Sequence, residues 1–401
     1  MSGGERPGPL AGLRVVELGT LIAGPFCARI LAEFGAEVIK IEAPDGGDPL
    51  RTWRKLHAGT SLWWAVQARN KKSVTVNLKS PAGQDIVRRL ARRADILVEN
   101  FRPGALEKWG LDYERLSADN PGLIMVRLSG YGQSGPYRDR PGFGAIGEAM
   151  GGMRFVTGDP DRPPVRAGIS LGDSVAAMYG VIGALMALHA RPGNGGRGQV
   201  VDVALYEAVF SLMESMLPEY DVTGFVRTRS GASLPGIVPS NTYGTRDGKY
   251  LVIGANADSI FKRLMAAIGR PDLAADPVLA TNAGRVTRTE ELDRVIGEWA
   301  ASVDLEQALE TLARAEVPAG KIYDVADIVR DVHYQARDML EQQRLADGTP
   351  IKLPGIVPKL GTDPGRTRWL GPALGEHTEE VLATLGYTAA DLARLRNEAV
   401  I

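Results

Sequence analysis

The alternation of strand and helix patterns along the first third of the chain is the feature that most restricts its fold. Residues 14–18 are typical of a short buried strand, Pro25 opens a helical pattern over residues 26–34, and residues 37–42 form a second strand pattern. A strand, a helix and a strand within about thirty residues form a right-handed βαβ unit, which requires a parallel sheet. Because the alternation continues to residue 128, we predict an α/β fold with a large, Rossmann-like open parallel sheet.

The expected elements then thin out into a loop-rich middle. Further strands are expected at 73–78, 95–99, 123–128 and 198–203, with helices at 81–93 and 205–216. Residues 130–168 are dense in glycine, and we expect them to form long loops. The predicted domains are a large one at 1–215 and a linker plus a smaller α+β domain at 216–330, followed by a C-terminal segment at 331–401.

Charge and composition exclude several classes of function. The chain of 401 residues holds 47 Lys and Arg against 48 Asp and Glu, so its formal net charge is −1 and gives no general case for binding nucleic acid or a membrane. The only cysteine, Cys27, excludes an internal disulfide and a multi-cysteine metal site. The four histidines lie far apart and lack metal-ligand spacing, so we predict no metal site.

Targeting and cofactor signals are weak throughout. Residues 1–12 are polar and rich in Gly and Pro, the apolar runs elsewhere read as too short or too interrupted to span a bilayer, and we expect a soluble, cytoplasmic protein. The turn at residues 19–25 lacks G-x-G-x-x-G, which disfavours a bound dinucleotide.

Residues 166–188 (RAGISLGDSVAAMYGVIGALMAL) place one acid, Asp173, where a glycine-rich turn meets a long helical pattern. The apolar residues spaced for one core-facing side of this helix are Val175, Met178, Val181, Ile182, Leu185 and Leu188. Asp173 can cap the helix, since its side chain can accept hydrogen bonds from the first backbone N–H groups. It can also be a nucleophilic carboxylate whose reaction is assisted by those N–H groups.

The same stretch spells G-x-S-x-G around Ser170, the nucleophile elbow of serine hydrolases. That motif needs a core strand directly before the Ser and a helix directly after it. Residues 158–168 are rich in Gly and Pro and favour a loop instead. A serine hydrolase therefore stays an alternative; the histidines that could complete its triad are His189, His333 and His377.

Several stretches, taken in order, resemble the class III coenzyme A transferases. They are PLAGLRVVELGTLIAGPF (9–26), LAEFGAEVIKIE (31–42), GGD (46–48), RNKKSVTVNLK (69–79), ADILVENFRPGALEKWGLDYERL (94–116), SGYGQSGPY (129–137), GGRGQVVDVALYEA (195–208) and LGEHT (374–378). The resemblance runs from about residue 8 to residue 390 and covers essentially the whole chain.

The nucleophile of this family is the Asp of a G-D-S motif, which falls on Asp173 here. The resemblance implies that its carboxylate attacks the donor thioester, giving a mixed anhydride and free CoA thiolate. The thiolate then attacks the enzyme side of the anhydride to form an aspartyl-CoA thioester, and the acceptor carboxylate reverses the sequence. Such intermediates conserve the energy of the thioester when water is excluded.

The resemblance also implies a coenzyme site. The residues at positions where family members line it are Leu21, Ala23, Lys79, Asn100, Phe101, Ala105, Lys108 and Leu205, with Arg102 as a further cation. Lys79 and Lys108 can meet phosphates, and Phe101 can pack on adenine. Coenzyme A and acyl-CoA are expected as substrates, with no tightly bound cofactor.

Departures from individual branches bear on the substrate. Ile22 and Ala43 replace residues of formyl-CoA transferase, and Phe143 stands where the racemase branch carries the histidine base of a G-H-D motif. Without that histidine, a racemase loses one of its two bases, so an α-methylacyl-CoA racemase-like isomerase is only an alternative. Ile22, Phe143 and Glu148 are the expected substrate-pocket residues.

Family members are interlocked homodimers, and the resemblance implies the same assembly, with residues 331–401 returning to the large domain. It also favours the branch that moves CoA from succinyl-CoA to small carboxylic or dicarboxylic acids. Cations that could meet the distal carboxylate of such an acceptor are Arg154, Arg166, Arg227 and Arg229, together with the stretch PGIVPSNTYG at 235–244.

Overall fold

The computed structural model describes residues 8–401 and separates them into two compact units. The first unit comprises the chain up to Met153, Ala167–Phe225 and Asp338–Ile401, and the second comprises Arg154–Arg166 and Val226–Arg337. The opening residues 1–7, on which part of the localisation prediction depends, lie outside the described residues.

A six-stranded parallel sheet forms the centre of the first unit, as the alternating pattern predicts. Its strands are β1 (Arg14–Glu17), β2 (Glu37–Glu42), β5 (Lys71–Thr75), β6 (Ile96–Glu99), β7 (Ile124–Ser129) and β8 (Val200–Ala204). They are ordered β5-β2-β1-β6-β7-β8, the arrangement of a doubly wound Rossmann sheet. The order reverses between β1 and β6, so the carboxyl ends of these two strands border the crevice in which such sheets bind ligands.

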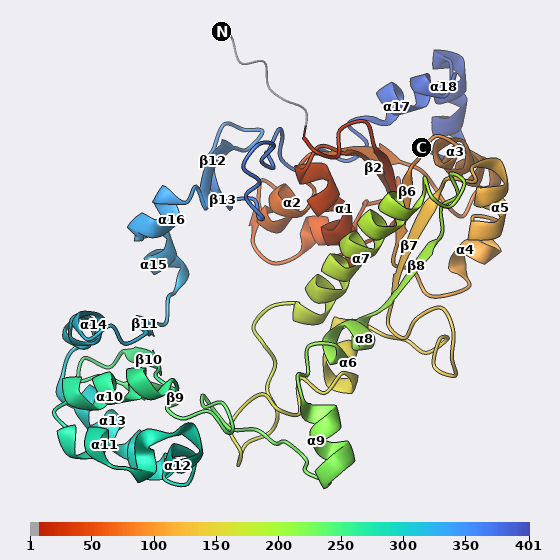
Figure 1. Cartoon of the computed structure of the whole chain (residues 1–401). Helices are drawn as coiled ribbons and strands as arrows, with labels where there is room; N and C mark the ends of the chain where they lie inside the picture. Colours follow the sequence, from red (N-terminus) through yellow and green to blue (C-terminus); the bar gives the residue numbers. More distant parts are fainter. Residues whose placement is uncertain (1–7) are drawn as a thin grey trace. The chain divides into compact units, whose positions relative to one another are not determined.

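Helices cover both faces of this sheet (Figure 1). On one face lie α1 (Ala23–Glu33) and α7 (Leu171–Ala190); on the other lie α3 (Pro81–Ala91), α4 (Ala105–Lys108), α5 (Tyr113–Asp119), α17 (Thr378–Thr384) and α18 (Ala389–Asn397). Burial on both faces explains why the central strands β6 (ILVE) and β7 (IMVRLS) are largely apolar runs rather than alternating ones. Most buried charges of the sheet lie toward the carboxyl ends of its strands, namely Glu17, Lys40, Glu42, Glu99 and Arg127; Lys71, the first residue of β5, is also buried.

Helix α7 packs largely through its small residues, which corrects part of the expected apolar face; Val175 and Val181 are buried as expected, and Leu188 is partly buried against the same core. Met178, Ile182 and Leu185 are exposed in the single chain, whereas Ala176, Ala177, Gly180, Ala184 and Ala187 are buried. A Cβ on Gly180 would lie 3.2 Å from Cys27 Sγ, and one on Gly183 would lie 2.4 Å from Val201 Cγ1. The small residues therefore allow a close approach to α1 and to the sheet.

The length of α7 also corrects the expectation that no apolar run could span a bilayer. Its 20 residues have a mean hydropathy of 1.6 and pass by length and composition alone. The core helix of a soluble protein passes the same test, and α7 contacts α1, β7 and β8. The absence of a membrane partner stays a prediction.

Several elements lie where the sequence suggested loops or different boundaries. The unexpected ones are η1 (Pro49–Thr52), β3 (Leu56–His57), β4 (Thr60–Ser61), α2 (Leu62–Gln67), α6 (Gly144–Met150) and α9 (Met216–Thr223). Helix α8 (Leu205–Phe210) stops before α9, and Glu214 between them has a positive φ of 48°. The glycines of α6 lower its intrinsic helix propensity, but packing against α7 and α8 stabilises it.

The second unit is α+β, as expected. Strands β9 (Ser240–Gly244), β10 (Tyr250–Gly254) and β11 (Ala319–Lys321) form an antiparallel sheet in the order β11-β10-β9. Its main helices are α10 (Asp258–Ala267), α13 (Thr289–Ser302) and α14 (Leu305–Arg314), and its smaller elements are α11 (Pro271–Ala275), η2 (Val278–Ala280), α12 (Asn282–Val286), α15 (Val325–Arg330) and α16 (Val332–Ala336). Back in the first unit, β12 (Leu340–Arg344) and β13 (Pro350–Pro354) pair as a hairpin.

Candidate functional site

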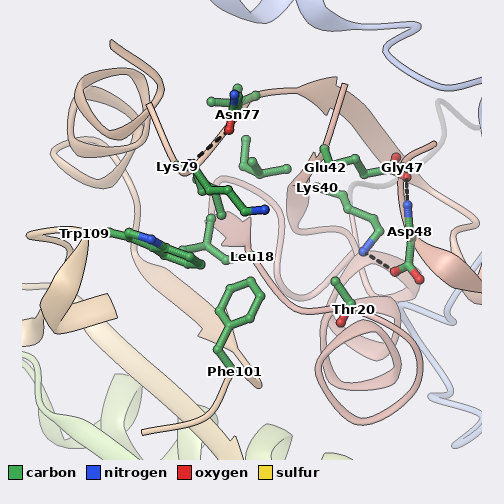
Figure 2. A pocket seen from close by; sticks show the side chains of 14 residues that line it. Leu18, Thr20, Lys40, Glu42, Gly47, Asp48, Asn77, Lys79, Phe101 and Trp109 are labelled. Carbon is green, nitrogen blue, oxygen red and sulfur yellow. Dashed lines mark hydrogen bonds and ion pairs between the residues drawn. The ribbon is translucent and has the colours of Figure 1, made fainter. Parts of the chain in front are cut away.

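A cavity of about 170 Å³ lies at the switch point of the large sheet. Its lining comes from the chain that follows β1, β2, β5 and β6, and includes Leu18, Ala43, Val76, Lys79 and Phe101. Because parallel strands end at one edge of a sheet, residues far apart in sequence meet there. Figure 2 shows the Lys79 side chain reaching across this cavity.

Two aromatic rings form one wall of the cavity. Phe101, after β6, and Trp109, after α4, meet edge to face, with 5.3 Å between ring centroids and 85° between planes (Figure 2). An apolar wall facing a lysine can hold a flat apolar group that carries negative charge. Sequence reasoning missed Trp109, because a bulky aromatic residue after a short helix is typical of core packing.

Glu99 fixes the turn that carries Phe101. Its carboxylate accepts hydrogen bonds from the Phe101 backbone N–H at 2.8 Å and from Arg127 Nε at 2.7 Å. Burial raises the pKa of Glu99 to about 7, and the Arg127 guanidinium only partly offsets that effect. The Phe101 ring is therefore positioned by a buried carboxylate at the end of its own strand.

The other expected coenzyme residues are placed differently. Lys79 and Phe101 line the cavity, whereas Asn100 lies beside it, hydrogen-bonded to both the N–H and the C=O of Thr20. Arg102 donates to the Asp139 carbonyl at 2.5 Å. Four more do not line it: Leu21 and Ala23 near the start of α1, and Ala105 and Lys108 on α4. Leu205 is buried as the first residue of α8.

Asp173 lies in the first turn of α7, three residues after the N-cap Ser170, so it is not the cap. Its carboxylate is partly buried against the backbone at the start of α6. A Cβ on Gly144 would lie only 2.0 Å from Asp173 Oδ2, so only glycine leaves room for the carboxylate in this position.

Glu148 and Phe143, two of the expected pocket residues, both belong to α6 or its N-cap. Glu148 is buried and accepts a hydrogen bond from the Gly172 backbone N–H at 3.3 Å. Phe143 is the N-cap of α6 and is 69% exposed. The packing of α6 against α7 thus brings the start of α6 and the buried Glu148 carboxyl group next to the first turn of α7, which carries Asp173. Ile22, the third expected residue, is the N-cap of α1.

Ser170 lacks the geometry of a nucleophile elbow. The chain before it, residues 163–169, forms no strand. His189 lies in the last turn of α7, about 28 Å away at the rise of a helix. His377 is the N-cap of α17, and His333 belongs to the second unit. The structure therefore does not support the hydrolase alternative.

Two further predictions concern a metal site and the arginines that could bind the acceptor. Among residues 8–401, no three His, Cys, Asp or Glu side chains are grouped to hold a metal ion. The four candidate acceptor-binding arginines lie in the second unit, where Arg229 Nη1 and Nε donate to the Phe155 and Asp159 carbonyls.

The profile of CoA-transferase family III matches residues 10–378. The chain belongs to this family. Its similarity extends over whole sequences: it is 52% identical to succinyl-CoA–D-citramalate CoA-transferase of Chloroflexus aurantiacus, with 100% of both chains covered. It is also 44% identical to the β subunit of succinyl-CoA–L-malate CoA-transferase of the same organism, with 98% of each chain covered.

Solved structures of family III agree with the fold. A CaiB/BaiF family protein from Brucella suis superposes with a TM-score of 0.83 and is 34% identical, over 95% of this chain and 100% of that one. The family and the α/β fold implied by the sequence motifs are thereby confirmed.

Proposed function

We propose that this family III enzyme transfers coenzyme A from succinyl-CoA to a small dicarboxylic acid. The observation that carries the proposal is the full-length similarity to succinyl-CoA-dependent CoA-transferases, at 52% and 44% identity. The cavity at the switch point supports it, because Lys79, Phe101 and Trp109 offer a cation and an aromatic wall for the nucleotide end of the coenzyme.

Asp173 is the nucleophile in this proposal. Its carboxylate attacks the carbonyl carbon of succinyl-CoA, the C–S bond breaks, and a mixed anhydride and CoA thiolate form. The thiolate then attacks the Asp173 carbonyl carbon and releases succinate, leaving an aspartyl-CoA thioester. The acceptor carboxylate attacks that thioester, the C–S bond breaks, and a second mixed anhydride and CoA thiolate form. The thiolate then attacks the acceptor's carbonyl carbon, which gives the product thioester and frees the Asp173 carboxylate. The position of Asp173 in the first turn of a 20-residue helix supports this role, since nearby backbone N–H groups stabilise negative charge.

The remaining coenzyme contacts are proposed from the family positions. Leu21, Ala23, Asn100, Arg102, Ala105, Lys108 and Leu205 would approach the coenzyme along its length, and Ile22, Phe143 and Glu148 would border the acyl and acceptor groups. No cofactor is required, since coenzyme A enters and leaves as part of the substrates.

A homodimer, as in family members, is proposed as the working assembly in the cytoplasm. The outward side of α7 supports it, because its exposed side chains form an apolar surface of the kind that protein interfaces cover; they are Met178, Tyr179, Ile182, Leu185 and Met186. One relative is named as the β subunit of its enzyme, so a second, different chain is the alternative partner to test.

The test uses the full chain with succinyl-CoA and no acceptor, followed by hydroxylamine and peptide mass spectrometry. We expect a hydroxamate on Asp173 in the wild type, none in Asp173→Asn, and wild-type labelling in Ser170→Ala. We also expect Asp173→Asn to lose at least about a thousandfold in kcat with citramalate or malate as acceptor. An unlabelled Asp173 across several acyl-CoA donors would contradict the mechanism, and exchange of an α-proton for deuterium would instead indicate a racemase.

A further inference from the structure

The segment Gly19–Ile22, between β1 and α1, has its backbone tied to buried or half-buried side chains at every residue. The Gly19 carbonyl accepts from Lys40 Nζ at 2.8 Å, and Asn100 bonds both the N–H and the C=O of Thr20. The Leu21 N–H donates to Asp48 Oδ1 at 3.1 Å. The Ile22 carbonyl accepts from Gln67 Nε2 at 3.1 Å. Four side chains from four parts of the fold thus fix four consecutive residues.

One residue of this segment is in an unfavourable conformation. Leu21 has φ = 63°, in the left-handed region, which costs a residue with a branched side chain about 1–2 kcal/mol. Such a conformation persists only where the surroundings enforce it. Among the hydrogen bonds of this segment given above, the one that the Leu21 backbone itself makes to a side chain is that from its N–H to Asp48.

Asp48 belongs to a quartet of buried charges, each no more than 1% exposed; its members are Glu17, Lys40, Asp48 and Lys71. Lys40 Nζ lies 2.8 Å from both Glu17 Oε1 and Asp48 Oδ2, and Lys71 Nζ lies 2.7 Å from Glu17 Oε2. Two cations and two anions sum to zero, so the quartet can be buried without an unpaired charge.

The pKa values of Lys40 and Lys71 shift in opposite directions, because the two lysines have different carboxylate partners. Although burial opposes it, the carboxylates of Glu17 and Asp48 raise the pKa of Lys40 above its ordinary value. Burial lowers the pKa of Lys71 to about 8; the Glu17 carboxylate at 2.7 Å only partly offsets this, and the charge of Lys40 lowers the pKa further. Lys40, the ion that links the quartet to the segment, therefore stays charged.

The quartet lies directly behind the candidate coenzyme cavity. Thr20, Lys40 and Asp48 contribute to its lining, and Figure 2 shows Lys40 and Asp48 joined beside Thr20. The Lys40 amine and the Asp48 carboxylate are already bonded to other groups of the protein. They therefore affect a ligand through the shape of Gly19–Ile22, and they have little capacity left to bind the ligand directly.

We propose that Asp48 and Lys40 are positioning residues for acyl-CoA binding, which hold Leu21 in its left-handed conformation and so keep Gly19–Ile22 in the shape that receives the coenzyme. This inference rests on the proposed function, because it assumes that the cavity takes the nucleotide end of coenzyme A. It assigns no chemical step to either residue.

The test compares two substitutions at Leu21, whose relative affinities for coenzyme A depend on the backbone conformation of this residue. Asn tolerates a positive φ, whereas the β-branched Val resists it more than Leu does. By calorimetric titration with free coenzyme A, we expect Leu21→Val to bind at least about tenfold more weakly than Leu21→Asn. A direct side-chain contact would give the opposite order, since Val resembles Leu more than Asn does, and that order would overturn the inference.

A second comparison removes the ion that holds the segment. We expect Asp48→Asn to raise the KM for succinyl-CoA about tenfold with less than about a threefold change in kcat, and Leu21→Gly in that background to recover much of the affinity. Glu33→Gln is the matched control, because Glu33 is also buried and pairs with Arg69 at the far end of α1. It should lower Tm comparably while leaving KM unchanged.

The possible failures are distinguishable. A wild-type chain that binds no coenzyme A would overturn the proposed function and this inference with it. Wild-type binding together with equal KM values for Asp48→Asn and Glu33→Gln would overturn the inference alone. If Asp48→Asn does not fold, the two Leu21 variants decide the question, because they leave the quartet intact.

Discussion

The surroundings of Asp173 and the segment Gly19–Ile22 are positioned by opposite physical means. Asp173 is held by close packing, in which Gly144 leaves no room for even a methyl group beside the carboxylate. Gly19–Ile22 is held by hydrogen bonds and buried charge, through Lys40, Asp48 and their partners. The first arrangement depends on the space at Gly144, and the second depends on paired buried charge at Lys40 and Asp48.

If the proposed function holds, this contrast lets one subunit place the nucleophile and the coenzyme wall by separate means. A shift of one part by steric change should leave the ionisation of the other unaltered, because their determinants have no residue in common. Four predictions test the contrast, in order of the expected change in free energy.

The largest effect is expected from breaking the charge quartet. Glu17→Gln leaves Lys40 and Lys71 buried without their shared carboxylate, and we expect the free energy of unfolding to fall by about 3–5 kcal/mol in urea denaturation. Glu37→Gln is the matched control, because its pairs with Arg14 and Lys72 are one-third exposed and are worth at most about 1 kcal/mol. An equal fall in the free energy of unfolding in the two variants would show that burial does not increase the contribution of the quartet to stability.

The next effect is steric. Gly144→Ala adds a methyl group that would lie 2.0 Å from Asp173 Oδ2, so the carboxylate must move. Gly144 is outside the positive-φ residues, so its backbone accepts Ala without strain. A displacement of about 1 Å should lower kcat about a hundredfold, or about 2.7 kcal/mol, in the transfer assay. Gly168→Ala, which meets no atom within 4 Å, should retain activity; parallel losses in both would argue against a steric cause.

A smaller effect is expected from pH. The folded pKa of Lys71, about 8, lies below the ordinary value of about 10.4. Between these values the unfolded chain binds a proton that the folded chain lacks, so Lys71 makes the free energy of unfolding rise with pH. From pH 8 to 9.5 the rise should be about 1–2 kcal/mol relative to Lys71→Met, measured by urea denaturation at each pH. Identical slopes in the two proteins would remove Lys71 as the titrating group, and Gly144→Ala should follow the wild-type slope.

The smallest effect concerns the aromatic wall, which uses neither glycine packing nor charge. Trp109→Leu removes the edge-to-face contact with Phe101, worth about 0.5–1.5 kcal/mol. We expect coenzyme A to bind about fivefold more weakly by calorimetric titration, with kcat little changed. Tyr387→Leu, which replaces a ring of the same core layer that lies against Arg89 and does not line the cavity, should leave the affinity as it is.

The sequence predicted the sheet well because hydrophobic runs report burial directly. The strand at 37–42 was predicted with its observed bounds, whereas α6 was missed because its stabilising contacts with Leu205 come from a distant part of the chain. The domain ranges 1–215, 216–330 and 331–401 stay predictions as independently folding parts.

Only those residues of the candidate site that belong to a recognisable sequence motif could be predicted. Asp173 was singled out by its place after a glycine turn and by family resemblance, and its catalytic role stays a prediction. The charge quartet could not be foreseen, because it depends on the register that sets Glu17 opposite Lys40 across β1 and β2. Residues on neighbouring parallel strands become partners only once strand order is known, and no local pattern supplies that order.

The neutral sum of the buried quartet restricts how these four positions can change over evolutionary time. A lineage that replaces Lys71 by a neutral residue leaves Glu17, Lys40 and Asp48 with one excess negative charge in a dry interior. Tolerated replacements should therefore arrive in compensating pairs of opposite sign, so these positions should covary among homologues. Divergence in substrate choice can proceed elsewhere in the chain while this group is inherited as a unit.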